Sequence, residues 1–185
     1  MDVMEAIRAR RSVREFTAEP VEETILRKLI DAAIQAPGAV NQQPWSFSIV
    51  RDRAVLAAVS RDAKAYMLRT SPMAASHHFN AILTDPKFDI FYGAPVLMVI
   101  ATSVDTNWAV EDCALAAANL MLAARALGLG TCWIGFAQGW LATADGKTTF
   151  NLPSGYRPVA PIIIGHPKAF PASVPRKEPE VHWIG

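Results

Sequence analysis

The spacing of apolar residues predicts two helices in the first part of the chain. Asp2, followed three positions later by Glu5, is typical of a capping box and predicts a short helix with one apolar edge. Pro20 opens a second helix, in which apolar residues recur at helical spacing from Val21 to Ala33. Pro37 marks the end of this helix, because proline cannot continue it. Both helices should pack one face on a core.

The middle of the chain alternates between apolar runs and one long helical segment. Residues 94–101 form a short, continuous apolar run, which predicts a central strand buried on both faces. Residues 131–135 and 159–165 predict two more strands, and another begins near Phe47. Trp108–Leu127 has alanine and leucine almost all round, which predicts a helix buried in a large core or at a dimer contact.

Three stretches have no clear period. Residues 66–92 mix methionine and aromatic residues with prolines, and they predict an irregular insert that is a lid, a pocket wall or an interface. Residues 139–155 are polar and predict a loop. Residues 166–185 are proline-rich and cannot form a core by themselves, so this tail must pack on another surface.

These elements predict one α+β domain over residues 1–185, with a mixed central sheet sandwiched by helices. No internal repeat or interdomain linker interrupts it. A chain of 185 residues can bury a sizeable core, and its 51% of hydrophobic residues exceeds the usual share. Part of this excess is expected to lie against another subunit.

The overall charge excludes several classes of partner. Eighteen basic and seventeen acidic residues leave a net charge of +1, which is too small to attract nucleic acid or an acidic membrane. No segment has the roughly 18 apolar residues that a membrane helix needs, and the N-terminus is too charged for a signal peptide. Cys113 and Cys132 match no zinc or disulfide pattern, and the adjacent His77 and His78 make a poor metal site. We therefore expect a cytoplasmic protein with reduced thiols and no metal.

Within this balanced chain, residues 8–16 concentrate four arginines and a serine. Guanidinium groups donate paired hydrogen bonds to phosphate, and the Ser12 hydroxyl can reach the same group. The segment therefore predicts an anion site, with a solvated arginine cluster as the alternative. Arg176 and Lys177 could complete that site or form a basic terminus. The loop at 36–45 carries side-chain amides that can bind the edge of a heteroaromatic ring or cap the loop's own backbone.

The pair Gly128 and Gly130 does not indicate a dinucleotide-binding motif. These glycines follow a predicted helix, whereas the phosphate-binding glycines of a Rossmann fold link a strand to a helix. We therefore reject the Rossmann interpretation.

Five short segments occur in a fixed order along the chain. They read Arg-Arg-Ser-Val-Arg-Glu-Phe at 10–16, Ala-Pro-x-x-x-Asn-x-Gln-Pro-Trp at 36–45, Ala-Pro-Val-Leu-Met-Val at 94–99, Leu-Gly-Leu-Gly-Thr-Cys-Trp-Ile-Gly at 127–135 and Arg-Lys at 176–177. Each segment is a weak signal alone. Together they resemble the FMN-dependent nitroreductase family over nearly the whole chain, and this resemblance implies a nitroreductase-like fold.

The resemblance also implies an assembly and a cofactor. It implies a homodimer with two FMN molecules at the subunit interface, the long central helix at that interface, and tail 166–185 packed on the partner subunit. By position, Arg10, Arg11 and Ser12 match the phosphate end of the flavin site, and Arg14 matches the N1 and O2 edge of the ring. The loop after Ala36 is commonly contributed by the partner subunit. The remaining implied cofactor-binding residues are Pro37, Gly38, Ala39 and Asn41 in this loop, Trp133, Ile134 and Gly135 beside the ring, and Arg176 and Lys177 at the phosphate.

The implied activity is electron transfer from NADH or NADPH, through flavin N5, to a small oxidant such as a nitroaromatic or a quinone. No acid or base side chain is expected to be catalytic. Reductive dehalogenation, flavin fragmentation or dehydrogenation on the same scaffold remain alternatives, as do a non-catalytic flavin-binding protein and a phospho-ligand sensor.

Two departures from the family pattern affect what can be expected of the geometry on the nicotinamide side of the flavin and of the substrate. Gly38 stands where many relatives have serine. Cys132 and Trp133 stand where the better-studied members have a Pro-x-Glu-Gly pattern.

Overall fold

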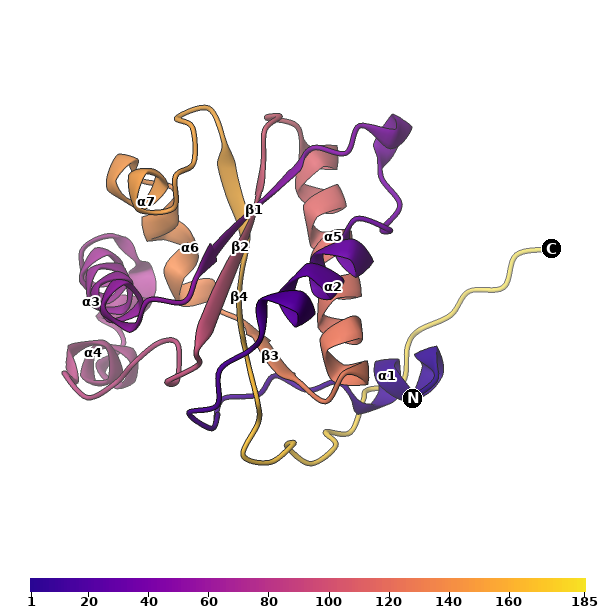
Figure 1. Ribbon diagram of the computed structural model, residues 1–185, viewed down its shortest axis with the longest axis horizontal. Helices are drawn as coiled ribbons and strands as arrows, with labels where there is room; N and C mark the ends of the chain where they lie inside the picture. Colours follow the sequence, from indigo (N-terminus) through magenta and orange to yellow (C-terminus); the bar gives the residue numbers. More distant parts are fainter.

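A four-stranded sheet passes through the middle of the molecule in the order β1-β2-β4-β3 (Figure 1). The structure is a computed structural model that describes residues 1–185. The strands are β1 (Trp45–Val50), β2 (Val96–Thr102), β3 (Gly130–Trp133) and β4 (Arg157–Gly165). The helices are α1 (Val3–Ala9), α2 (Glu23–Ala33), η1 (Ala39–Asn41), α3 (Arg53–Thr70), η2 (Pro72–Ala75), α4 (His77–Thr84), α5 (Asn107–Ala126), α6 (Gly135–Leu141) and α7 (Ala144–Thr149).

Strand β2 is central and buried along its whole length, as the apolar run predicts. It pairs with β1 on one side and β4 on the other, with Val96 opposite Ile164. Because side chains alternate across a strand, Leu97 and Val99 face one core, and Met98 and Ile100 face the other. The sheet therefore separates two apolar layers.

Helices cover both layers. Helices α3, α4, α6 and α7 lie on one face of the sheet, and α1, α2 and α5 lie on the other (Figure 1). The first core includes Leu56 and Val59 of α3, and the second includes Leu29 of α2 and Leu120 of α5. The α+β class and the helix-covered sheet are thus confirmed.

The sheet differs from expectation in one respect. All three strand pairs are antiparallel, so the four strands do not form a mixed sheet. The parallel component is confined to an isolated bridge between Ser12 and Thr131.

Two segments that predict irregular structure are largely helical. Asp52 caps the start of α3 by accepting hydrogen bonds from the next turn, and this helix continues to Thr70. The end of α3, η2 and α4 together occupy most of residues 66–92. Residues 139–155, expected to form a loop, contain the end of α6 and all of α7. Their apolar residues are too few for a clear period, but Trp140, Leu141 and Phe150 are buried and hold these short helices on the core.

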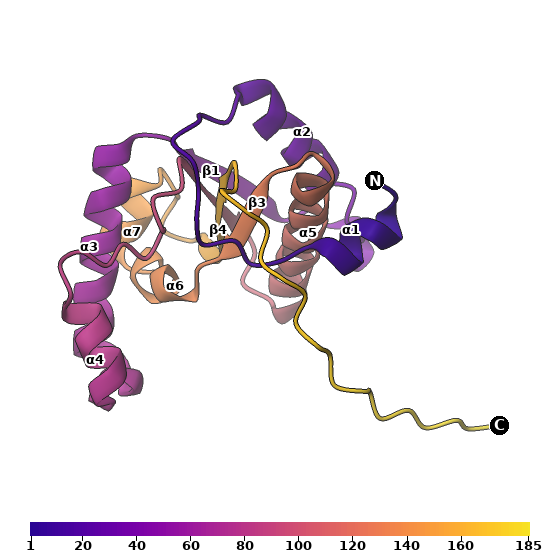
Figure 2. The ribbon, with the colours of Figure 1, turned by 90° about the horizontal axis from the view of Figure 1, so that it is seen from below.

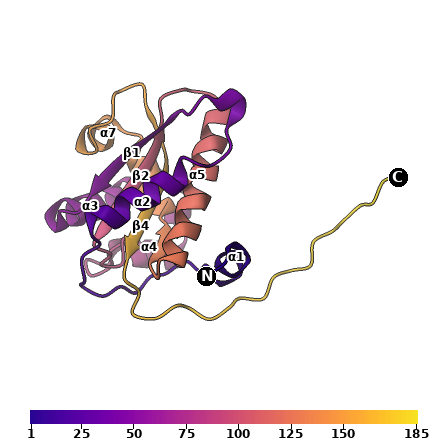
Figure 3. The ribbon, with the colours of Figure 1, turned by 45° about the vertical axis from the view of Figure 1, so that its right-hand side comes forward.

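The tail that follows β4 leaves the body of the protein. Residues after 170 form no helix or strand, and Figures 2 and 3 show the chain running past α1 and away from the sheet. Trp183 is 92% exposed although it is a large apolar side chain. No helix of the structure is long and apolar enough to span a membrane.

Candidate functional site

The arginine segment runs alongside β3. The Val13 amide donates to the Thr131 carbonyl at 2.9 Å, next to the bridge that joins Ser12 and Thr131. Val13 is 1% exposed, so this residue anchors an extended segment by burying its side chain. Ser12 and Arg14 flank the anchor. The structure thereby brings residues 10–16 and residues 127–135 together, two of the five segments that resemble the family.

A cavity of about 380 Å³, which we call the ring cavity, lies where these segments meet. Its lining is mainly apolar with one cation. The Arg14 guanidinium lies 5.9 Å from the centre of the Tyr92 ring. Apolar walls with a single fixed positive charge suit a flat aromatic ligand that carries negative charge at one edge. The lining residues are Arg14, Met67, Met73, Tyr92, Cys132, Trp133, Ile134, Gly135 and Phe136.

The pKa of the Cys132 thiol depends on the charged groups around this cavity. Burial raises the pKa of Cys132, while the positive charges of Arg14 and Arg10 and a hydrogen bond with Ser12 act in the opposite direction. Burial dominates, so the thiol stays protonated at neutral pH. Arg14, Ser12 and Arg10 therefore all lie near the Cys132 thiol.

Arg11 has a different role from its neighbours. Its Nη1 atom donates to the carbonyls of Arg8 and Arg10, at 2.7 and 2.6 Å, and its Nε atom donates to the Ala172 carbonyl at 3.3 Å. Arg11 therefore fastens the arginine segment to the start of the tail. The Nε and Nη1 donors of Arg11 are thus already used within the chain.

The loop that contains Pro37–Asn41 lies near the other end of α5. The Ala39 amide donates to Asp112 Oδ1 at 3.0 Å in the first turns of this helix. At the opposite end, Arg125 Nε donates to the Ala9 carbonyl at 3.4 Å, beside the arginine segment. With a rise of about 1.5 Å per residue, Asp112 and Arg125 are about 20 Å apart. A single chain therefore does not bring the Pro37–Asn41 loop and the arginine segment together.

This loop has an unusual backbone. Val40, Asn41 and Gln43 have φ values of 47, 54 and 51°, in the left-handed region that non-glycine residues rarely adopt. A β-branched residue such as Val40 is particularly unfavourable there, and its side chain is exposed. Strain of this kind persists where a defined loop shape is needed, which supports a binding role for the loop.

Gly38 lies against a buried carboxylate. Asp112 is 3% exposed, and its Oδ2 atom has no hydrogen-bond partner. A Cβ atom added at Gly38 would lie 3.2 Å from this Oδ2. Gly38 has a φ of −148°, which any residue can adopt. A side chain at this position would lie against Asp112, whose carboxylate must shift by a few tenths of an ångström, and a serine hydroxyl there could donate to it.

We expect Gly38→Ser to be more stable than Gly38→Ala by about 1 kcal/mol, because only serine supplies a donor to the unpaired oxygen. Both variants introduce the same close Cβ contact, so alanine is the matched control. Urea unfolding at one fixed protein concentration measures the difference. Equal stability of the two variants would show that Asp112 Oδ2 does not gain a hydrogen bond.

Arg176 and Lys177 are exposed and lie on the extended tail. The tail that carries them runs away from the body of the protein (Figure 3), and no ion pair or hydrogen bond joins them to Arg10 or Ser12 of the same chain. Their expected place at a phosphate therefore requires the tail to fold back or to reach another subunit.

The fold and the site define an α+β domain with a cationic, apolar-walled cavity at the β3 edge of its sheet. The chain belongs to the nitroreductase family, because the sequence model of that family matches residues 7–166.

Individual relatives agree with this assignment. A Methanothermobacter thermautotrophicus protein, whose name proposes an NADH dehydrogenase or NAD(P)H nitroreductase activity, is 30% identical over 94% of this chain and 81% of its own length. The FMN reductase [NAD(P)H] of Bacillus subtilis is 27% identical over 95% of this chain and 70% of its own length. A Bacteroides fragilis nitroreductase with bound FMN superposes with a TM-score of 0.82 at 25% identity, covering 100% of this chain and 98% of that one.

Several residues of the site do not follow from the sequence motifs. Met67, Met73, Tyr92 and Phe136 line the ring cavity, so part of the 66–92 segment is a pocket wall. Tyr92 is held by a tight turn, in which both it and Gly93 have positive φ and Asp89 accepts the Gly93 amide at 2.9 Å. An aspartate followed four residues later by glycine is the one sequence signal for this turn.

Proposed function

We propose that this protein is an FMN-dependent oxidoreductase that takes electrons from NADH or NADPH and passes them to a small oxidant such as a nitroaromatic or a quinone. It would act as a cytoplasmic homodimer with FMN at the subunit interface. The observation that carries the proposal is the meeting of Arg14 with Trp133–Gly135 around one mainly apolar cavity, with Ser12 bridged to Thr131 of the neighbouring strand. Membership of the nitroreductase family supports the same chemistry.

The residues present fit FMN in both of its parts. Arg10 and Ser12 supply a guanidinium and a hydroxyl for the phosphate, and the apolar cavity beside them supplies walls for the ring. Arg14 supplies the single positive charge on those walls. Arg11 would contribute indirectly, since its donors hold the segment that carries Arg10.

The separation along α5 supports a site shared between two chains. The Pro37–Asn41 loop is about 20 Å from the arginine segment of its own chain, so Gly38, Ala39 and Asn41 would face the flavin of the partner subunit. Exposed apolar side chains on α1 and α5, among them Met4, Trp108 and Leu115, would be covered in such a dimer. The tail would then pack on the partner and place Arg176 and Lys177 near a phosphate.

The side chains of the site would act through charge and shape. FMN, when bound, supplies the hydride and electron transfer itself. Arg14 provides a fixed positive charge that stabilises negative charge gained by the ring. Met67, Met73, Tyr92 and Phe136 supply apolar walls that would limit water around a bound ring and leave space for a flat donor or oxidant. No acid or base side chain is needed.

A backbone amide beside the ring is a further expected contact. The Ile134 amide already donates to the Pro161 carbonyl at 2.8 Å. The contact with N5 would therefore come from the amide of Trp133 or Gly135, at the turn between β3 and α6.

Anaerobic mixing of the yellow protein with NADH or NADPH tests this function. We expect the flavin absorbance to bleach with at least one of the two donors and to return when a quinone or nitroaromatic is added. Persistent colour with both donors would contradict the enzyme and favour a non-catalytic flavin-binding protein. Colourless protein that does not take up FMN would instead favour a phospho-ligand sensor. Reductive dehalogenation stays an alternative, since an iodotyrosine deiodinase bound to FMN and 3-iodo-L-tyrosine has a similar fold, with a TM-score of 0.78 at 22% identity.

A further inference from the structure

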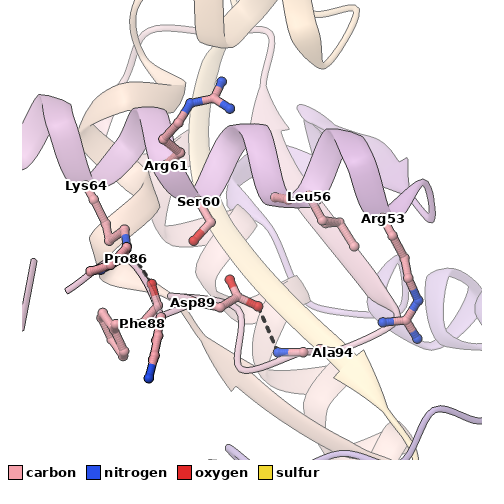
Figure 4. A pocket seen from close by; sticks show the side chains of 12 residues that line it. Arg53, Leu56, Ser60, Arg61, Lys64, Pro86, Phe88, Asp89 and Ala94 are labelled. Atoms are coloured by element: carbon pink, nitrogen blue, oxygen red, sulfur yellow. Dashed lines mark hydrogen bonds between the residues drawn. The ribbon is translucent and has the colours of Figure 1, made fainter. Parts of the chain in front are cut away.

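A second cavity, of about 510 Å³, lies between α3 and the segment that leads into β2 (Figure 4). It shares no lining residue with the ring cavity. Four cationic side chains and one carboxylate line it, although the whole chain has a net charge of only +1. The lining residues are Arg53, Leu56, Ala57, Ser60, Arg61, Lys64, Pro86, Lys87, Phe88, Asp89, Gly93 and Ala94.

Helix α3 presents the cavity with one face. Arg53, Ala57, Ser60 and Lys64 follow each other at helical spacing, so their side chains lie on the same side. Arg53 and Lys64 reach from this face toward the opposite segment (Figure 4). Arg61 points away from it and pairs with Asp62 at 3.0 Å (Figure 4). The cations available to a ligand are therefore Arg53, Lys64 and Lys87.

Lys64 is a buried cation without an anionic partner. It is 9% exposed, and its Nζ atom donates to the carbonyls of Asp85 and Phe88 at 2.9 and 2.6 Å. It forms no ion pair, although burying an ammonium group is costly unless an anion compensates it. An ammonium has three donors, so one remains for a group in the cavity.

A second buried group has an unused donor. The Ser60 hydroxyl lies one helical turn from Lys64 and accepts the Ile90 amide at 3.1 Å, which leaves its own proton free. The carboxylate of the cavity is already committed, since Asp89 accepts the amides of Phe91 and Gly93, both at 2.9 Å. The hydrogen-bonding groups of the cavity that remain unused are thus mainly donors.

We propose that this cavity binds a phosphate-bearing anion of nucleotide size, independently of the flavin site. Lys64, Ser60 and Lys87 would hold the phosphate, since ammonium and hydroxyl donors together suit its several oxygens. Leu56 and Phe88 would contact an apolar body of the ligand, and the volume is within the range of small-molecule sites. Arg53, at the start of α3, would donate to another oxygen of the same ligand.

A ligand in this second cavity would contact Phe88, which packs on the wall of the ring cavity. The Phe88 ring packs edge to face with Tyr92 and Phe136, with ring centres 5.9 and 6.3 Å apart. Tyr92 and Phe136 both line the ring cavity. A ligand on Phe88 would therefore lie one aromatic layer from the flavin without touching it.

The test is calorimetric titration of the protein with ADP in the presence of saturating FMN, with inorganic pyrophosphate as a second probe. We expect ADP to bind wild-type protein at micromolar to submillimolar concentration. Each of Arg53→Ala and Lys87→Ala should weaken binding about tenfold, the effect of losing one charge-assisted contact. Both side chains are exposed, so the substitutions should leave the fold intact.

Arg69→Ala is the matched control, because Arg69 is an exposed arginine of α3 that does not line the cavity. It should bind ADP like wild type. An equal loss in Arg69→Ala would show diffuse attraction to a basic helix and overturn the proposal. Absence of ADP and pyrophosphate binding to wild-type protein would also overturn it, as would binding that is lost only in Arg10→Ala. Bleaching of the flavin by NADH or NADPH is a separate measurement, so this site and the proposed function can fail independently.

Discussion

Replacing Arg14 with alanine should leave much of the FMN bound but slow its reduction by NADH or NADPH about ten- to a hundredfold. This loss corresponds to ~1.4 to 2.7 kcal/mol of transition-state stabilisation. Arg14 is the only charged residue that lines the ring cavity, so no neighbour can replace its charge. Binding should persist because Arg10 and Ser12, the proposed phosphate-binding residues, are unchanged in this variant. Anaerobic stopped-flow absorbance measures the rate.

Arg8→Ala is the control for this variant. Arg8 belongs to the same arginine cluster, but its side chain is exposed on α1 and does not line the cavity. Reduction of Arg8→Ala should proceed at the wild-type rate. A wild-type rate in Arg14→Ala, or an equal loss in both variants, would remove Arg14 from the proposed role.

Gly130→Ala should destabilise the protein by about 1–3 kcal/mol and weaken FMN binding at the same time. A Cβ atom at this position would lie 2.8 Å from Cβ and Cγ1 of Val13. Val13 is the buried anchor between Ser12 and Arg14, and its β-branched side chain cannot move aside alone. The arginine segment must therefore shift away from β3. Chemical unfolding and FMN titration measure the two effects.

Gly155→Ala is the matched control, since a Cβ atom there would meet nothing within 4 Å. It should change neither stability nor FMN affinity appreciably. If Gly130→Ala lowered stability but bound FMN as tightly as wild type, the contact between Val13 and β3 would not position the cofactor site.

The predicted fold succeeds where a residue pattern has one physical solution. The run from Ala94 to Ala101 has no polar face, so only a strand between two apolar layers can bury it. The apolar sides of Trp108–Leu127 similarly require a helix between neighbours. Strand direction is not encoded in such patterns, because a strand buried on both faces looks the same in parallel and antiparallel pairing. For this reason the mixed sheet was a wrong prediction.

The candidate site shows a similar division. The motifs at 10–16 and 127–135 identify segments that meet through the Val13 contact with Thr131. The pocket residues Met67, Tyr92 and Phe136 have no motif, since apolar side chains in a cavity wall resemble those of a core. The cofactor-binding roles of the Pro37–Asn41 loop and of Arg176 and Lys177 stay predictions, because they depend on a partner chain.

The second cavity, which Lys64 lines, could not be predicted from the sequence. In sequence, Lys64 is an ordinary polar residue that no motif distinguishes. Its burial and its missing counter-charge follow only from the packing of α3 against Asp85–Phe88.

The central claim is that two chains together hold FMN. Native mass spectrometry of the purified protein measures chain number and flavin number in one experiment. We predict a single main species of two chains with two FMN molecules. A one-chain species that retains FMN, or a dimer without any flavin after incubation with FMN, would contradict this account.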